Sequence, residues 1–263
     1  MIFDSMPLWM SGTLLVIVPT GLAMAGTYFI RRFVGLERLS SNNEVAGFKF
    51  ATIGVLYAVL LAFAVIVVWE KFSDAEDHVA MEAAAAASLY RLADGIHGEP
   101  GPAIKKKLTD YLESAITQDW LAMEMGKPSP ATTRALADIY ATALTYKPAD
   151  FRDAMLMQET LHQLNSLTEA RRARVVKAGV TVPGVLWLVL FAGAFITVGF
   201  TFFFGTENLP AQSMMTGALT LLVFSGLFVI VAINQPFAGA VKVRPEALIE
   251  VAQELGGLRV SER

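Results

Sequence analysis

The chain has 263 residues, of which 21 are Lys or Arg and 24 are Asp or Glu, so 17% are charged and 54% are hydrophobic. An average soluble domain is about 25% charged. The net charge of −3 is too small to indicate nucleic-acid binding. The absence of cysteine excludes disulfides, thiolate metal sites and a cysteine nucleophile.

The charges are unevenly distributed along the chain. Four windows contain no charged residue at all: 8–30, 50–69, 183–204 and 214–233. Each has the roughly 20 residues that a helix needs to cross the hydrocarbon core of a bilayer. The other 178 residues carry all the charges, at the ordinary soluble density of about 25%. The sequence therefore predicts an all-α polytopic membrane protein with four transmembrane helices.

The first window is expected to remain as a span. Its apolar stretch is longer than the roughly 7–15 residues of a signal peptide, and Asp4 precedes it where a signal peptide has basic residues.

The four spans form two predicted hairpins around a soluble insertion. Residues 1–69 hold the first hairpin, 183–235 hold the second, and 236–263 form a tail with a short amphipathic helix over about 245–255. The insertion, 70–182, carries 16 acidic and 13 basic residues. Its breaks are rich in Gly and Pro, which stop helices. They predict four helices, over about 69–92, 103–125, 132–146 and 149–177.

The first soluble helix is predicted to continue straight from span two. Residues 69–92 contain neither Gly nor Pro and include a run of alanines, which favour helix. Apolar positions recur there every three or four residues, which predicts a buried stripe. The stripe consists of Val79, Ala83, Ala86, Tyr90 and Ala93.

Basic residues near the span ends predict the topology, because Lys and Arg are enriched on the cytoplasmic side. Seven lie near the ends that share a side with the insertion and the termini, against four on the other side. We therefore expect both termini and the helical insertion to be cytoplasmic.

The sequence predicts no enzyme, and neither a cofactor nor a metal. Its three histidines have no metal-binding spacing, and no nucleotide-binding or serine-hydrolase motif occurs. An acidic cluster follows span two, where Glu70, Lys71 and Asp74 are candidate membrane-exit charges. These carboxylates could bind a cation or act as a pair, or they could form a solvated helix face.

Span two is the most strongly patterned element. Ala51, Gly54, Ala58 and Ala62 place small side chains along one stripe, which is typical of close helix packing in lipid. The alternative is that this stripe borders a pore, or that the neighbouring face does, which includes Val55, Val59, Phe63 and Ile66. The candidate pore-lining or packing residues are Gly54, Ala58, Ala62, Phe63 and Ile66. Charge-free spans argue against a proton-coupled transporter but not against a passive channel.

A basic run precedes span three. Arg171, Arg172, Arg174 and Lys177 are candidates for binding anionic lipid headgroups, and simple topology anchoring is the alternative.

Two segments carry a family resemblance. Glu44-Val45-Ala46-Gly47-Phe48-Lys49-Phe50-Ala51, with the following 54–63 and Trp69-Glu70, resembles the opening signature of the bestrophin-like domain family of bacterial membrane proteins. Pro236-Phe237-Ala238-Gly239 and Val243-Arg244-Pro245-Glu246-Ala247-Leu248 resemble its closing motif. The resemblance covers about 35–255 and implies a bacterial inner-membrane location.

More distantly, Leu61-Ala62-Phe63 and Trp69-Glu70 are similar in order and spacing to bestrophin-type anion channels. That likeness implies a pentamer with four spans per subunit. The chain departs from it at 64–68, which is wholly apolar where bestrophins have an Arg and an Asp.

Two functions are therefore expected. The first is an oligomeric ion channel, for anions by resemblance, with span two near the axis and the lipid bilayer as its surroundings. The second is a non-conducting scaffold or sensor whose soluble helices bind a partner that the sequence does not identify.

Overall fold

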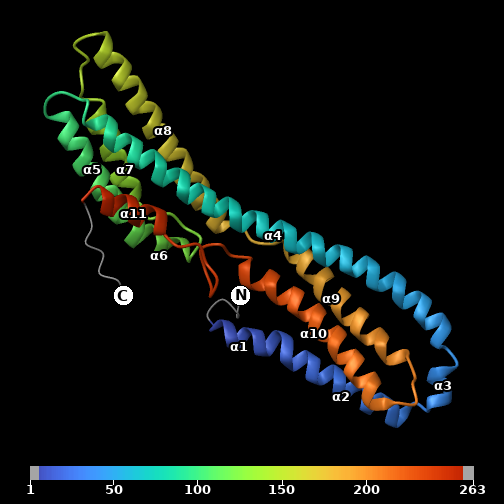
Figure 1. Cartoon of the computed structure of the whole chain (residues 1–263). Helices are drawn as coiled ribbons and strands as arrows, with labels where there is room; N and C mark the ends of the chain where they lie inside the picture. Colours follow the sequence, from blue (N-terminus) through green and yellow to red (C-terminus); the bar gives the residue numbers. More distant parts are fainter. Residues whose placement is uncertain (1–5, 257–263) are drawn as a thin grey trace. The chain divides into compact units, whose positions relative to one another are not determined.

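The computed structural model describes residues 6–256, and within that range it consists of helices and connecting loops without strands (Figure 1). Four helical stretches are long and apolar enough to cross a membrane: Leu8–Phe33, Asn43–Ala93, Gly184–Phe203 and Leu209–Ile233. They form two hairpins with a helical insertion between them, which confirms the predicted fold class.

The chain divides into two compact units. The first, called the membrane unit, comprises the described residues up to Glu70 together with Thr181–Asn234 and Gly239–Val241. The second, called the soluble unit, comprises Lys71–Val180, Gln235–Ala238 and the described residues from Lys242 onward. Helix α4 (Asn43–Ala93) runs through 51 residues and contributes to both units.

Span one is interrupted by a wider turn. It consists of α1 (Leu8–Gly12), a π-helical segment η2 (Thr13–Ile17) and α2 (Val18–Phe33). Pro19 lies at the start of α2 and has no N–H to donate to the preceding turn, and such a site favours a local π-bulge.

Span two begins earlier than the charge pattern suggests. Residues 31–49, which separate the first two charge-free windows, contain the short α3 (Leu36–Ser40) and the first turns of α4. The amide of Asn43 connects this start to the second hairpin. It donates to the Gly205 carbonyl at 2.8 Å and accepts from the Gly205 N–H at 3.0 Å, which joins the loops of the two hairpins.

Glycines on the second hairpin receive large side chains from the first. The second hairpin consists of α9 (Gly184–Phe200), the short η4 (Thr201–Phe203) and α10 (Leu209–Ile233). A Cβ atom added at Gly193 of α9 would lie 2.4 Å from the Tyr57 ring of α4. On α10, a Cβ at Gly226 would lie 2.7 Å from Leu61, and one at Gly217 would lie 2.8 Å from Met24. Close packing therefore depends on small residues of α9 and α10.

The soluble unit packs six further helical segments around the end of α4. They are α5 (Pro100–Ser114), the π-helical η3 (Ala115–Asp119), α6 (Trp120–Met123), α7 (Pro130–Ala143), α8 (Phe151–Gly179) and α11 (Glu246–Glu254). Of the predicted α4 stripe, Val79, Ala83, Ala86 and Ala93 are buried in this core, while Tyr90 is half-buried. The side chains of Ser129 and Asp150 cap α7 and α8 at their first turns.

The tail after span four belongs to this core. Trp120 donates through Nε1 to the Val243 carbonyl at 3.2 Å, and its ring meets Phe237 edge-on at 5.9 Å. Leu248 and Ala252 of α11 are buried. The tail thus adds a helix to the soluble unit.

Packing of α4 on α9 predicts the effect of filling one glycine. Gly193→Leu places a side chain where the Tyr57 ring lies, so we expect overpacking to destabilise the membrane unit by about 1–3 kcal/mol. The thermal melting midpoint of the full-length protein in detergent measures this. Gly184→Leu on the same helix is the control, since no atom lies within 4 Å of its added Cβ. Equal midpoints for the two variants would contradict this packing.

Candidate functional site

One face of span two is exposed, because the other helices of the chain do not cover it. Val55 and Phe63 are each 64% exposed, and Val59 and Ile66 are each 49% exposed. These four residues recur at spacings of four, four and three, which places them on one side of the helix. We call them the outer face of α4. It is an apolar surface that no other described helix covers.

The opposite side of α4 packs inward. Tyr57, Ala64 and Val68 are buried, and the Tyr57 hydroxyl donates to the Leu190 carbonyl of α9 at 3.1 Å. Large side chains, rather than the small-residue stripe, therefore make the contacts of α4 with the second hairpin.

The small-residue stripe lies beside the outer face. Ala58 and Ala62 are exposed and Gly54 is half-buried, with no atom within 4 Å of an added Cβ at Gly54. Within one chain the stripe does not serve helix packing. It remains available to a second chain, to lipid or to a pore.

The candidate membrane-exit charges continue along α4. Glu70 and Asp74 are exposed, and Lys71 donates to the Val180 carbonyl. Asp74 accepts a hydrogen bond from Lys177 of α8 at 2.6 Å, and this bond lowers the pKa of Asp74 below its usual value. Both pairs bring the start of the soluble part of α4 to the end of α8.

Two of the four proposed headgroup ligands lie inside the soluble unit. Arg174 is fully buried and Arg171 is 7% exposed, so neither side chain is available to a lipid surface. Arg172 is exposed, and Lys177 is half-buried at Asp74. The sequence-based interpretation of Arg171 and Arg174 is therefore corrected. Headgroup contact stays a proposal for Arg172.

The two buried arginines pair with two buried carboxylates. Arg174 donates to Glu82 of α4 through Nε at 2.6 Å and through Nη2 at 2.9 Å. Its Nη2 also reaches Asp119 of η3 at 3.2 Å, and Arg171 holds Asp119 through two bonds of 2.8 and 3.1 Å. We call these four residues the buried charge cluster. Its formal charges balance, and paired, hydrogen-bonded geometry is the condition under which buried charges are tolerated.

Neighbouring groups complete the cluster. The Tyr111 hydroxyl donates to Glu82 at 2.6 Å, the Ser129 N–H donates to Asp119 at 2.8 Å, and the Trp120 ring lies 4.6 Å from the Arg174 guanidinium. Burial and the Glu82 charge raise the pKa of Tyr111. Burial by itself would lower the pKa of Arg174, but attraction and hydrogen bonds from Glu82 outweigh it and raise that pKa. The cluster joins α4, α8, η3 and the start of α7.

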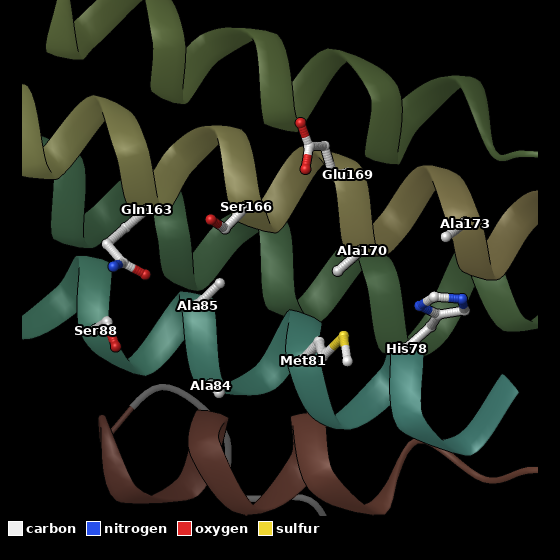
Figure 2. A pocket seen from close by; sticks show the side chains of 10 residues that line it. All are labelled: His78, Met81, Ala84, Ala85, Ser88, Gln163, Ser166, Glu169, Ala170 and Ala173. Atoms are coloured by element: carbon white, nitrogen blue, oxygen red, sulfur yellow. The ribbon is translucent and has the colours of Figure 1, made fainter. Parts of the chain in front are cut away.

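A groove lies between α4 and α8 in the soluble unit, with a volume of about 510 Å³ (Figure 2). Alanines of both helices form its base, and Figure 2 shows Gln163 of α8 pointing toward α4. Its polar rim residues are His78, Ser88, Gln163, Ser166 and Glu169. Among residues 6–256 no group of three His, Asp or Glu side chains is arranged to hold a metal ion. The groove offers shape and a few polar groups rather than a reactive constellation.

The sequence carried a signal for the buried arginines. Met157, Leu164 and Leu167 of α8 are buried, and Arg171 and Arg174 continue the same alternation of three and four residues. Glu82 likewise falls three residues after buried Val79 and four before buried Ala86. Ionisable residues within apolar stripes could have indicated a buried pair.

Comparison with known proteins yields one family and one fold. The sequence pattern of the Bestrophin-like domain family matches residues 17–248. No curated protein matches the sequence. A crystal structure of a bacterial bestrophin homologue from Klebsiella pneumoniae, bearing a leucine-to-threonine mutation, superposes with a TM-score of 0.72 at 14% identity. The match covers 91% of this chain and 97% of that one. A structure of the homologue phased with zinc gives a TM-score of 0.69 at 14% identity and covers 91% and 96%.

The buried charge cluster predicts a large loss on removing one partner. Glu82→Gln removes the carboxylate that holds Arg174 through two hydrogen bonds and leaves Asp119 to balance both buried arginines, so we expect the soluble unit to lose about 3–5 kcal/mol of stability. Thermal melting of the full-length protein in detergent, followed by circular dichroism, checks this.

Asp138→Asn is the matched control, because it breaks an exposed ion pair with Lys107 that is worth less than about 1 kcal/mol. A melting midpoint for Glu82→Gln as high as that of the control would show that the cluster does not stabilise the unit.

Proposed function

The chain belongs to the bestrophin-like domain family, and from this premise we propose that several copies assemble in the membrane around an ion pathway lined by the outer face of α4. The single observation that carries the proposal is the bare apolar side of span two. It is supported by the likeness of the fold to bacterial bestrophin homologues.

The geometry of α4 suits a pathway between copies. Its inner side is engaged with α9 and α10, while Ala58 and Ala62 leave room beside the outer face. Phe63 and Ile66 would then narrow the pathway with apolar side chains. Apolar constrictions of this kind can gate by losing their water.

Two observations bear on which ion is conducted, and they point in opposite directions. The resemblance implies anions, and this is the ion we expect. Glu70 and Asp74, however, are exposed carboxylates just beyond the span, and negative charge at a mouth concentrates cations. A flux measurement must therefore compare chloride with potassium.

Liposome flux tests the pathway. Purified protein should raise chloride flux above that of empty vesicles, and Ala58→Trp should lower it at least about tenfold, because a bulky ring fills the space beside Phe63. Leu222→Trp is the control, since Leu222 is exposed and lies on α10 rather than on α4. Potassium flux without chloride flux would correct the ion. No flux of either ion would refute the channel.

The scaffold or sensor is the second candidate, and the groove between α4 and α8 favours it by offering a place for a partner. If the subunits form a ring, the purified protein in mild detergent should have the mass of several chains. A monomeric mass together with inactive liposomes would favour the scaffold.

We also propose that both termini and the soluble unit are cytoplasmic, in the inner membrane of a bacterium. Seven basic residues against four support this orientation. A reporter fused after Arg263 that is active only in the cytoplasm should give signal. Signal from a second reporter at the same position, one that is active only outside the cytoplasm, would reverse the orientation.

A further inference from the structure

A long groove marks the surface of the membrane unit between α2, α9 and α10. It consists of two cavities of about 420 and 340 Å³, and Gly199 and Phe202 line both of them. The two cavities therefore adjoin at these residues, where the Phe202 ring packs against Gly26 of α2. Together they have the size of a small-ligand site, which is commonly 300–1,000 Å³.

The inner cavity is apolar. Its walls include Leu22 and Pro19 of α2, Phe195 of α9 and Phe224 of α10. Thr220 is its one hydroxyl, and that group already donates to the Thr216 carbonyl at 2.7 Å. The lining of this cavity therefore favours an apolar ligand.

The outer cavity ends at a cation. Ile30, Val34 and Phe203 continue the apolar walls, while Arg38 and Asn42 lie at the opposite end, in the polar connection between spans one and two. Asn42 donates to the Arg38 carbonyl, and no ion pair involves the Arg38 guanidinium within residues 6–256. The groove thus combines long apolar walls with one positive charge, that of Arg38, at the membrane boundary.

The two cavities together extend far enough along α2 to hold a lipid chain. From Pro19 to Val34 the helical rise is about 22 Å, which exceeds the roughly 15 Å depth of one leaflet's hydrocarbon. The positive charge of Arg38 favours a lipid with a negative headgroup over an apolar helix of a second copy.

We propose that this groove binds an acyl chain of an anionic phospholipid whose phosphate lies at Arg38. The walls supply burial for the chain, and Arg38 supplies the preference for a negative headgroup. The site is independent of the proposed ion pathway, because none of the residues that line it belongs to α4.

Gly199 allows the groove to be filled without disturbing the fold. No atom lies within 4 Å of a Cβ added there. Gly199→Leu therefore places a side chain where the two cavities meet. Gly21→Leu is the matched control: Gly21 is also open, lies on α2, and lines neither cavity.

Native mass spectrometry of the full-length protein in mild detergent, with added phosphatidylglycerol or phosphatidylcholine, tests the site. We expect retained phosphatidylglycerol on the unaltered chain and on Gly21→Leu, and at least about tenfold less on Gly199→Leu. Arg38→Gln should reduce the preference for phosphatidylglycerol over phosphatidylcholine about fivefold, and Arg38→Lys should restore most of it.

Two results for Gly199→Leu would overturn the proposal. The first is equal phosphatidylglycerol retention by Gly199→Leu and Gly21→Leu. The second is an unchanged lipid count with a smaller oligomer in Gly199→Leu, which would make the groove a contact between copies. Arg38→Gln keeps the test decisive if Gly199→Leu does not fold, since Arg38 is exposed. Its unaltered lipid preference would also contradict the proposal.

Discussion

The packing of α4 against glycines of the second hairpin is the constraint on which the membrane unit depends. Tyr57 and Leu61 use the inner side of α4 because Gly193 and Gly226 leave them room. That arrangement turns Phe63 outward, where no described residue covers it. In a bilayer such a face is either dissolved in lipid or shared between copies. The proposed ion pathway requires that this face be shared between copies.

The soluble unit depends on a different interaction, the buried charge cluster. Arg174 and Glu82 are 92 residues apart in the chain and are both fully buried. Neither charge could stay in the interior alone, since an unpaired buried charge costs several kcal/mol. Each helix that supplies a partner is therefore held in place by the others. The bidentate geometry also fixes the rotation of α8 against α4, which forms the groove between these two helices.

The sequence predicts the architecture well because charge density alone separates the spans from the insertion. Gly and Pro then locate the breaks between soluble helices. Prediction from local pattern fails where a partner distant in the sequence determines whether a side chain is buried. Arg171 and Arg174 precede span three and so resemble lipid-facing residues, but their carboxylate partners lie far away in the sequence. Likewise, the small-residue stripe that includes Ala58 has the pattern of a packing surface. In the structure, however, α4 packs against Gly193 of α9 through Tyr57, on another side of the helix.

The central claim is that the outer face of α4 borders water between copies of the chain. The sequence contains no cysteine, so a single Ala62→Cys can report on this position without background. Its accessibility to a charged, water-soluble thiol reagent in lipid vesicles, relative to Leu222→Cys on α10, is the most direct measurement. We predict rapid modification of Ala62→Cys, slow modification of Leu222→Cys, and disulfide cross-linking of Ala62→Cys between copies. Equally slow modification of both positions, without cross-linking, would contradict the account.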